Sequence, residues 1–244
     1  VASGRAGLRL LTVARMDSRE RYKGHDLILE ALALLQSAGR LAPALRWRVV
    51  GSGDDRARLQ ARAQALALAE QIDWLGSLDD ASLEQEYGSC SLVVMPSAYA
   101  IEPDGTPRGE GFGITYLEAA LAGRASIAAD RGGQSDLILD GRTGWLIPPT
   151  AEALAALLER LQRHPEQVLA CGAAARRHAL AGFTAAQQRR RLAQLVAPWS
   201  RPLASPPPGA GGRAGGQPAG PCTGAPTADT AATMPGSSAL RGHG

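Results

Sequence analysis

The chain has 244 residues, of which 45% are hydrophobic and 20% charged, and its formal net charge is +3. This is the composition of an ordinary soluble globular protein. No apolar run approaches the roughly 20 residues that a helix needs to cross a bilayer, and the mild charge gives no reason to expect a nucleic-acid partner. The three cysteines are scattered and no secretory leader opens the chain. We therefore interpret the protein as cytoplasmic, with reduced thiols and neither a disulfide framework nor a zinc site.

Short apolar runs alternate with helical patterns from residue 8 to residue 197. They predict strands at 8–13, 46–51, 72–76, 91–97, 125–129 and 144–147, and helices at 25–37, 54–69, 81–88, 113–122, 151–162, 165–180 and 184–197. The central strand runs are apolar throughout, as they are when helices cover both faces of a parallel sheet. We therefore predict an α/β fold with a doubly wound, Rossmann-like parallel sheet and trailing helices. The predicted N-caps are Asp54, Asp79 or Asp80, Thr150 and Thr184.

The two ends of the chain depart from this pattern. The chain begins with Val1 and enters a strand-like run within a few residues, so we interpret it as a fragment that lacks an upstream part. Residues 201–244 contain ten glycines and eight prolines, which is above the roughly 25–30% at which an aperiodic segment is expected to be disordered. We therefore predict one domain over residues 1–200 and a disordered tail over residues 201–244.

In a doubly wound sheet, ligands bind outside the carboxyl ends of the strands, so the loops after the strands are the places to search. The loop after the first predicted strand carries Arg15 and Lys23, followed by Gly24. Two cations at a strand end suit an anion such as phosphate, although a solvated charged loop explains them equally well. After the second strand, Gly51 and Gly53 form a G-x-G without the third glycine of the dinucleotide fingerprint. We expect these two glycines to let the backbone turn tightly beside a ligand.

The stretch RGEGFGITYLEAALAG, residues 108–123, predicts a tight loop that ends at a helix N-terminus. The backbone N–H groups of residues 112–114 lie where a helix favours an anion. Glu118, one turn into the helix, can accept two hydrogen bonds from a vicinal diol such as ribose, and Glu110 can accept from a second polyol. A favourable interaction with the helix dipole is the alternative explanation of Glu110. Gly132 and Gly133 predict a second group of exposed N–H donors. The cations, glutamates and backbone N–H groups of these loops together indicate a nucleotide-sugar site.

Six motifs in order resemble the donor-binding half of glycosyltransferase family 4, whose members are retaining enzymes of GT-B fold. They are RMDSRERYKGHD, VVGSGD, WLGSLDD, VVMPS, EGFGITYLEA and GGQSDLILDGRTGWLIPP. The resemblance covers about residues 8–196, and its most specific element is the pair of glutamates with seven residues between them, Glu110 and Glu118. Asp136 stands where the family commonly has a glutamate.

The resemblance implies a role for each matching position. Arg15 and Lys23 would hold the donor diphosphate, and Glu110 would contact hydroxyls of the donor sugar. Glu118 would bind the ribose. The remaining positions are backbone neighbours of the sugar and phosphates and residues beside the base: Gly51, Leu78, Gly111, Phe112, Gly113, Ile114 and Thr115.

The resemblance also implies a reaction. A hexose such as mannose or glucose would move from a nucleoside diphosphate to an unknown acceptor with retention at the anomeric carbon, and without a bound metal or other cofactor. The family's acceptor domain lies in the N-terminal half, which this chain lacks. We therefore expect the chain alone to bind nucleotide sugar weakly and to transfer nothing.

Other functions fit parts of the same sequence. A non-catalytic nucleotide-sugar binding module would use the same residues. A Rossmann oxidoreductase would rest on the GSGD motif, but the missing third glycine argues against it. A GT-B sugar epimerase fits the two glutamates less well. The arginine-rich helices suit either a solvated face, which we prefer, or peripheral contact with anionic lipid; their arginines are Arg160, Arg163, Arg176, Arg177 and Arg189–Arg191.

Overall fold

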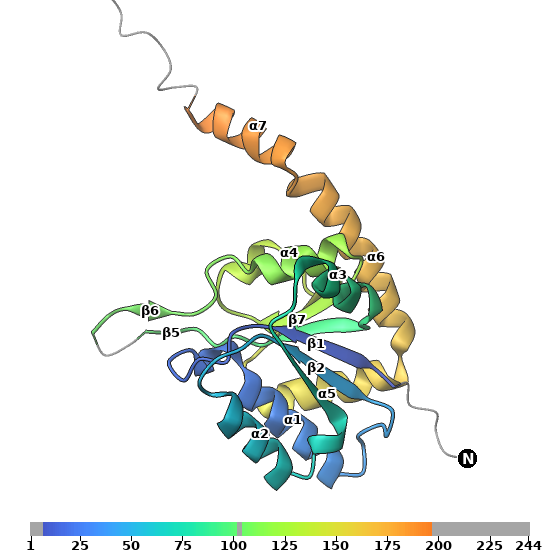
Figure 1. Ribbon diagram of the computed structural model, residues 1–244. Coiled ribbons are helices and arrows are strands. Elements are labelled where there is room, and N and C mark those ends of the chain that lie inside the picture. Colours follow the sequence, from blue (N-terminus) through green and yellow to red (C-terminus); the bar gives the residue numbers. More distant parts are fainter. Residues whose placement is uncertain (1–6, 102–103, 197–244) are drawn as a thin grey trace, which may run out of the picture. The chain divides into compact units, whose positions relative to one another are not determined.

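The computed structural model describes residues 7–101 and 104–196, which form six parallel strands with helices on both faces (Figure 1). The strand order is β3-β2-β1-β4-β7-β8. The strands are β1 (Arg9–Val13), β2 (Arg46–Val50), β3 (Ile72–Gly76), β4 (Leu92–Met95), β7 (Ala125–Ala129) and β8 (Gly144–Ile147). All six predicted strands are confirmed. The order of the strands reverses between β1 and β4, which is the position where doubly wound sheets bind ligands.

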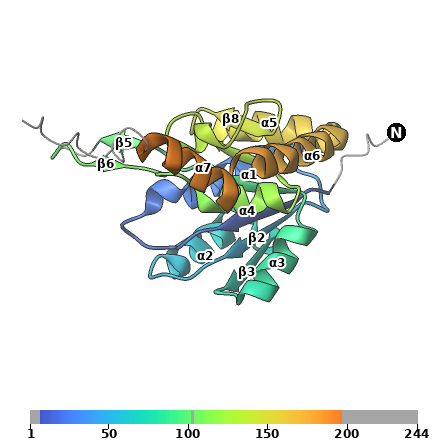
Figure 2. The same cartoon turned by 90° about the horizontal axis from the view of Figure 1, so that it is seen from above.

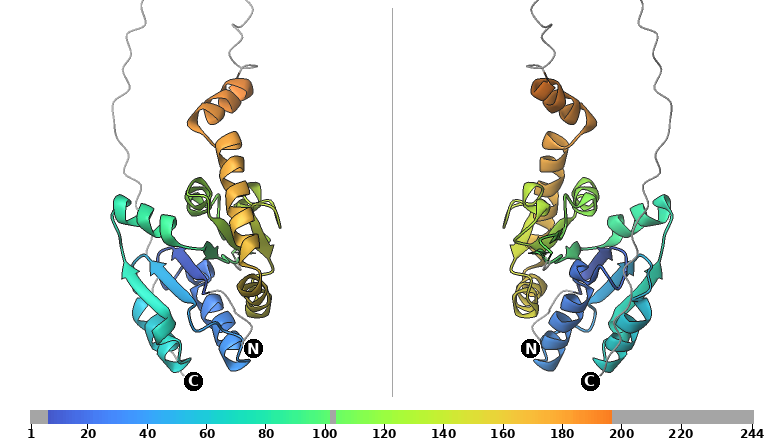
Figure 3. Two further views of the ribbon diagram at one scale, coloured as in Figure 1. Left: turned by 90° about the vertical axis from the view of Figure 1, so that its right-hand side faces the viewer. Right: turned by 90° about the vertical axis from the view of Figure 1, so that its left-hand side faces the viewer.

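Helices pack on the two faces of the sheet, as Figures 1 and 3 show. On one face lie α1 (His25–Ser37), α2 (Arg56–Ala65) and α5 (Ala151–Arg163), and on the other lie α3 (Asp80–Ser89) and α4 (Ile114–Leu121). The helix α6 (Pro165–Gly182) packs on α4 and β7 and precedes α7 (Ala185–Val196). The predicted doubly wound α/β fold is therefore confirmed.

Two buried clusters fill the space between the sheet and its helices. The first cluster joins alternate residues of the strands, such as Leu10 and Val49, to α1, α2 and α5. The second cluster joins the intervening strand residues, such as Leu11 and Val93, to Tyr87 of α3 and Tyr116 of α4. Because successive side chains of a strand point to opposite faces, one apolar run supplies both clusters.

The helix ends follow the predicted caps with one exception. The side chains of Asp79, Thr150 and Thr184 accept hydrogen bonds from the backbone N–H three residues later. Asp54 does not cap a helix. The helix α2 begins later, at Arg56, and the Asp54 carboxylate instead accepts from the backbone N–H and hydroxyl of Ser18, both at 2.8 Å. This contact ties the loop after β2 to the loop after β1.

Three features of the fold differ from the predicted elements. The helix predicted over 54–69 ends at Ala65, and Ala67 takes a left-handed φ of 54° before the short 3-10 helix η2 (Ala69–Gln71). The loop after β4 contains an antiparallel hairpin of β5 (Ala100–Ile101) and β6 (Pro107–Arg108), which extends away from the sheet (Figure 2). Two further 3-10 helices, η1 (Arg21–Lys23) and η3 (Gly133–Asp136), lie in loops after strands.

Some predictions concern residues that the structure does not describe. The predicted tail at 201–244 and the start of the chain at 1–6 lie outside the described residues. Among the residues that are described, no helix is long and apolar enough to cross a membrane.

Candidate functional site

The loops after β1 and β2 lie against each other because two glycines allow it. Gly51 and Gly53 have φ angles of 132° and 155°, which residues other than glycine rarely adopt. A Cβ atom at Gly51 would lie 2.1 Å from the Ala14 carbonyl oxygen, and one at Gly53 would lie 2.0 Å from that of Met16. The expected tight turn is present, and it lies against the loop after β1.

Lys23 and Glu110 meet although 87 residues separate them. The Lys23 ammonium lies 2.9 Å from Glu110 Oε2, and the two side chains are only 17% and 14% exposed. Lys23 ends η1, and Gly24 with φ +89° turns the chain into α1 close to the Pro96 carbonyl. An ion pair that is largely withdrawn from solvent is screened less by water and salt than a surface pair.

A pocket of about 330 Å³ surrounds this ion pair. It lies at the carboxyl ends of β1 and β4, and eight of the predicted site residues line it: Arg15, Lys23, Glu110, Gly111, Phe112, Gly113, Ile114 and Thr115. Val13, Ala14 and Met95 complete the lining. The Arg15 side chain is 71% exposed and is paired with Glu20 at 2.6 Å. We call this space the β1–β4 pocket. It offers two cations, one carboxylate and the N-terminus of α4.

The loop that carries Glu110 is held by the segment after β7. The Gly133 N–H donates to the Glu110 carbonyl at 3.1 Å, and a Cβ atom at Gly133 would lie only 1.6 Å from the Gly111 carbonyl oxygen. The prediction of Gly133 as an exposed anion donor is therefore wrong, because its N–H is already bonded within the protein. The contact instead fixes the backbone on which Glu110 stands.

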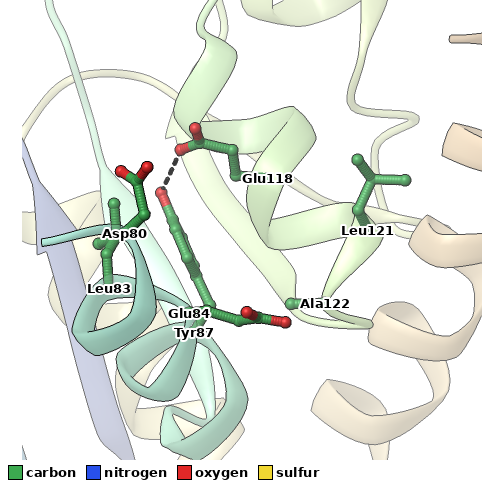
Figure 4. A pocket seen from close by; sticks show the side chains of 7 residues that line it. All are labelled: Asp80, Leu83, Glu84, Tyr87, Glu118, Leu121 and Ala122. Atoms are coloured by element: carbon green, nitrogen blue, oxygen red, sulfur yellow. Dashed lines mark hydrogen bonds between the residues drawn. The ribbon is translucent and has the colours of Figure 1, made fainter. Parts of the chain in front are cut away.

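Glu118 lies in a second pocket, of about 370 Å³, between α3 and α4 (Figure 4). The Tyr87 hydroxyl donates to Glu118 Oε2 at 2.7 Å. The helix α4 contributes to both pockets: Ile114 and Thr115 line the β1–β4 pocket, and Glu118 lines the second one. We call the second space the α3–α4 pocket; its lining residues are Asp80, Leu83, Glu84, Tyr87, Glu118, Leu121 and Ala122.

The structure thus brings together nine of the eleven predicted site residues around one helix and its preceding loop. Gly51 and Leu78 line neither pocket; Leu78 packs at the edge of the second cluster. Sequence reasoning missed Tyr87, Glu20 and the holding role of Gly133. A lone tyrosine in the polar run SLEQEYGS carries no signal of its own, and the two other contacts depend on a loop fold that the residue pattern does not specify. Among the described residues, no group of three or more His, Cys, Asp or Glu is arranged to hold a metal ion.

The family model of glycosyl transferases group 1 matches residues 8–178 of this chain. The chain belongs to the glycosyl transferases group 1 family. A phosphatidyl-myo-inositol mannosyltransferase of Mycobacterium leprae is 32% identical over 179 residues, which are 71% of this chain and 43% of that protein. A GDP-mannose-dependent alpha-(1-6)-phosphatidylinositol monomannoside mannosyltransferase of Mycolicibacterium smegmatis is 29% identical over 180 residues, 71% of this chain and 44% of that protein.

Solved glycosyltransferase structures share the fold. A sucrose-phosphate synthase from Thermosynechococcus elongatus superposes with a TM-score of 0.64 at 27% identity, over 81% of this chain and 47% of that one. Anabaena HepE, solved in complex with UDP and glucose, superposes with a TM-score of 0.64 at 22% identity, over 79% of this chain and 48% of that one. At that identity the second likeness bears on the fold alone. The chain spans less than half the length of the relatives and solved chains named here.

Proposed function

We propose that this chain is the donor-binding half of a retaining family 4 glycosyltransferase that moves a hexose from a nucleoside diphosphate to an acceptor. The observation that carries the proposal is the ion pair of Lys23 and Glu110 in a pocket that Arg15 also lines. Cations for a diphosphate and a carboxylate for sugar hydroxyls stand side by side there. The family membership of residues 8–178 supports the same conclusion.

The proposed chemistry is electrostatic. When the sugar leaves, the bond from its anomeric carbon to the diphosphate oxygen breaks and the electron pair stays on the diphosphate. Arg15 and Lys23 would stabilise that developing charge, which is the term that contributes most in many enzymes. The Lys23 ammonium has three protons and donates one to Glu110, so two remain for phosphate oxygens.

The α4 N-terminus and the two glutamates would complete the donor site. Backbone N–H groups at Gly113, Ile114 and Thr115 suit the phosphates because the positive end of the helix dipole lies there. Glu110 would accept from hydroxyls of the sugar, and Glu118 from those of the ribose. In this scheme the protein's own cations do the work that a metal ion does in other transferases, so we propose a metal-independent reaction.

The names of the relatives support a donor class. Two relatives are named mannosyltransferases and one of them is named for its dependence on GDP-mannose, so we propose a hexose donor such as a mannose or glucose nucleotide. Transfer also needs an acceptor site, which we assign to polypeptide outside this chain. The chain alone is expected to bind the donor and to transfer no sugar.

The single lysine of the chain, Lys23, gives a sharp test. A lysine-selective acylating reagent labels only Lys23 and the amino terminus, and mass spectrometry separates the two peptides. Labelling of Lys23, measured with and without GDP-mannose, GDP-glucose, UDP-glucose or ADP-glucose, should fall in the presence of the correct donor, while labelling of the amino terminus should not change. Equal labelling of Lys23 with and without all four sugars would disprove the proposed site.

A further inference from the structure

Tyr87 occupies a fixed position in the α3–α4 pocket. The residue is only 4% exposed and belongs to the second cluster with Leu11, Val93 and Ala119. Because buried side chains are held in one rotamer by close packing, the ring delivers the hydroxyl group to a single place. Figure 4 shows that place, beside the carboxylate of Glu118 on α4.

The hydroxyl of Tyr87 is a permanent hydrogen-bond donor. Burial, together with the adjacent Glu118 carboxylate, raises the pKa of Tyr87 well above its ordinary value, and a hydrogen bond with Thr115 lowers it by less. The phenol therefore keeps its proton at neutral and mildly alkaline pH. Its proton points at Glu118 Oε2 over a distance of 2.7 Å, which is typical of a hydrogen bond to a charged acceptor.

Glu118 depends on this bond for its orientation. A glutamate on a helix surface has three rotatable side-chain bonds and samples several rotamers in water. Within the described part of the chain, the Tyr87 hydroxyl is the one hydrogen-bonding or ionic partner of the Glu118 side chain. With Oε2 accepting from Tyr87, Oε1 and the second lone pair of Oε2 are available to accept from two neighbouring hydroxyl groups.

We propose that Tyr87 is a positioning residue that orders the Glu118 carboxylate for the vicinal diol of the donor's ribose. This inference rests on the proposed function, since it needs a nucleotide in the site. Tyr87 does not itself contact the diol; it holds the acceptor in the geometry that two adjacent hydroxyls require. Ordering the acceptor before binding lowers the entropy that the complex loses.

The test compares nucleotides that differ only in the diol. Calorimetric titration of the full chain with UDP, GDP and ADP, each against its 2′,3′-dideoxy counterpart, gives a preference ratio for the diol. In Tyr87→Phe that ratio should fall about tenfold, the size expected for losing one hydrogen bond to a charged group. In Glu118→Gln the preference should be smaller still, and adding Tyr87→Phe to Glu118→Gln should change nothing further, because Tyr87 acts through Glu118.

The outcomes separate the two proposals. If no nucleotide binds the unaltered chain, the proposed function fails. If nucleotides bind with a diol preference that Tyr87→Phe leaves intact, only the role of Tyr87 fails. Should Tyr87→Phe not fold, Tyr87→Met serves instead, because methionine removes the hydroxyl group and fills the buried apolar space with a flexible side chain. It should lower the same ratio, and an unchanged ratio would refute the inference.

Discussion

Lys23 is the single lysine among the 26 lysine and arginine residues of the chain. In a protein that otherwise uses arginine, a lysine at the β1–β4 pocket has a physical reason. An ammonium is a compact charge with rotatable donors, whereas a guanidinium is a wide planar fork. The Lys23 side chain is only 17% exposed, so the space around its charge is limited.

We expect Lys23→Arg to weaken nucleotide-sugar binding at least about tenfold, because the larger head group displaces Glu110 from its place in the pocket. Titration calorimetry with the donor that protects Lys23 from labelling measures the loss. Arg40→Lys is the matched control, since Arg40 pairs with Glu159 at the surface, away from the β1–β4 pocket. Equal affinity of Lys23→Arg and the unaltered chain would show that charge alone matters at this position.

His25 gives a pH dependence to stability. Its side chain is 4% exposed, and burial lowers the pKa of His25 from 6.5 to about 4, although Asp26 and Asp55 oppose the shift. Below pH 6.5 the unfolded chain binds a proton that the folded chain does not. This group therefore removes stability as the pH falls from 6.5 towards 4, by about 3 kcal/mol in all.

Urea unfolding at pH 7 and pH 4.5 measures this effect. His25→Gln should lose less stability than the unaltered chain between the two pH values, because glutamine does not titrate. His164→Gln, at an exposed histidine, should follow the unaltered chain. Parallel pH profiles for all three proteins would mean that another group controls acid unfolding.

At the scale of elements, the loop of residues 110–113 is positioned by a contact between two backbones. We expect Gly133→Ala to cost about 1–3 kcal/mol of folding stability, since the added methyl group overlaps the Gly111 carbonyl and one of the two loops must move. Because Glu110 stands on the displaced loop, nucleotide-sugar affinity should fall as well. Chemical unfolding and calorimetric titration measure the two effects.

Gly88→Ala is the matched control for that substitution. Gly88 lies in α3, and a Cβ atom there meets no atom within 4 Å. The change should leave affinity unaltered and raise stability by up to about 1 kcal/mol, because alanine favours a helix. A Gly133→Ala protein with full stability and affinity would show that the two loops adjust without consequence.

The elements that the sequence predicts correctly are those with a repeating pattern. The strand β4 is an unbroken, fully buried apolar run, and α1 and α5 repeat their apolar residues at helical spacing. The β5–β6 hairpin has only two residues in each strand, too few for a pattern of alternation. The predicted cap at Asp54 is wrong because a partner distant in sequence, Ser18, takes the carboxylate. At Asp54 the local preference for capping a helix is overridden by this tertiary contact.

At the scale of the whole molecule, the site follows the same rule: the sequence predicts what the strand order determines and misses what tertiary packing determines. The sequence predicts that Arg15, Lys23, Glu110 and Glu118 gather at one edge, because parallel strands end together at a switch point. It does not predict that Glu118 lines a different pocket from the other three. That separation depends on how α4 rotates as its buried residues, Tyr116 and Ala119, pack into the second cluster.

A ligand at this edge should stabilise the whole domain. The β1–β4 pocket is built from loops after the two central strands and from α4, so that unfolding either face of the sheet destroys it. At a donor concentration of 100 times Kd, binding to the folded state alone adds about 2.7 kcal/mol. For a domain of this size the midpoint of thermal unfolding should then rise by roughly 5–10 °C.

Differential scanning calorimetry measures this rise, and three further scans locate its cause. Lys23→Met should lose most of the rise because the diphosphate loses a cation that is largely shielded from solvent. Glu118→Ala should lose part of it, since only the ribose contact goes. A nucleoside without phosphates should give almost none, because the two cations and the helix N-terminus have nothing to bind. A nucleoside that raised the midpoint as much as its diphosphate sugar would place the binding energy in the base and ribose, and the paired cations would then need another explanation.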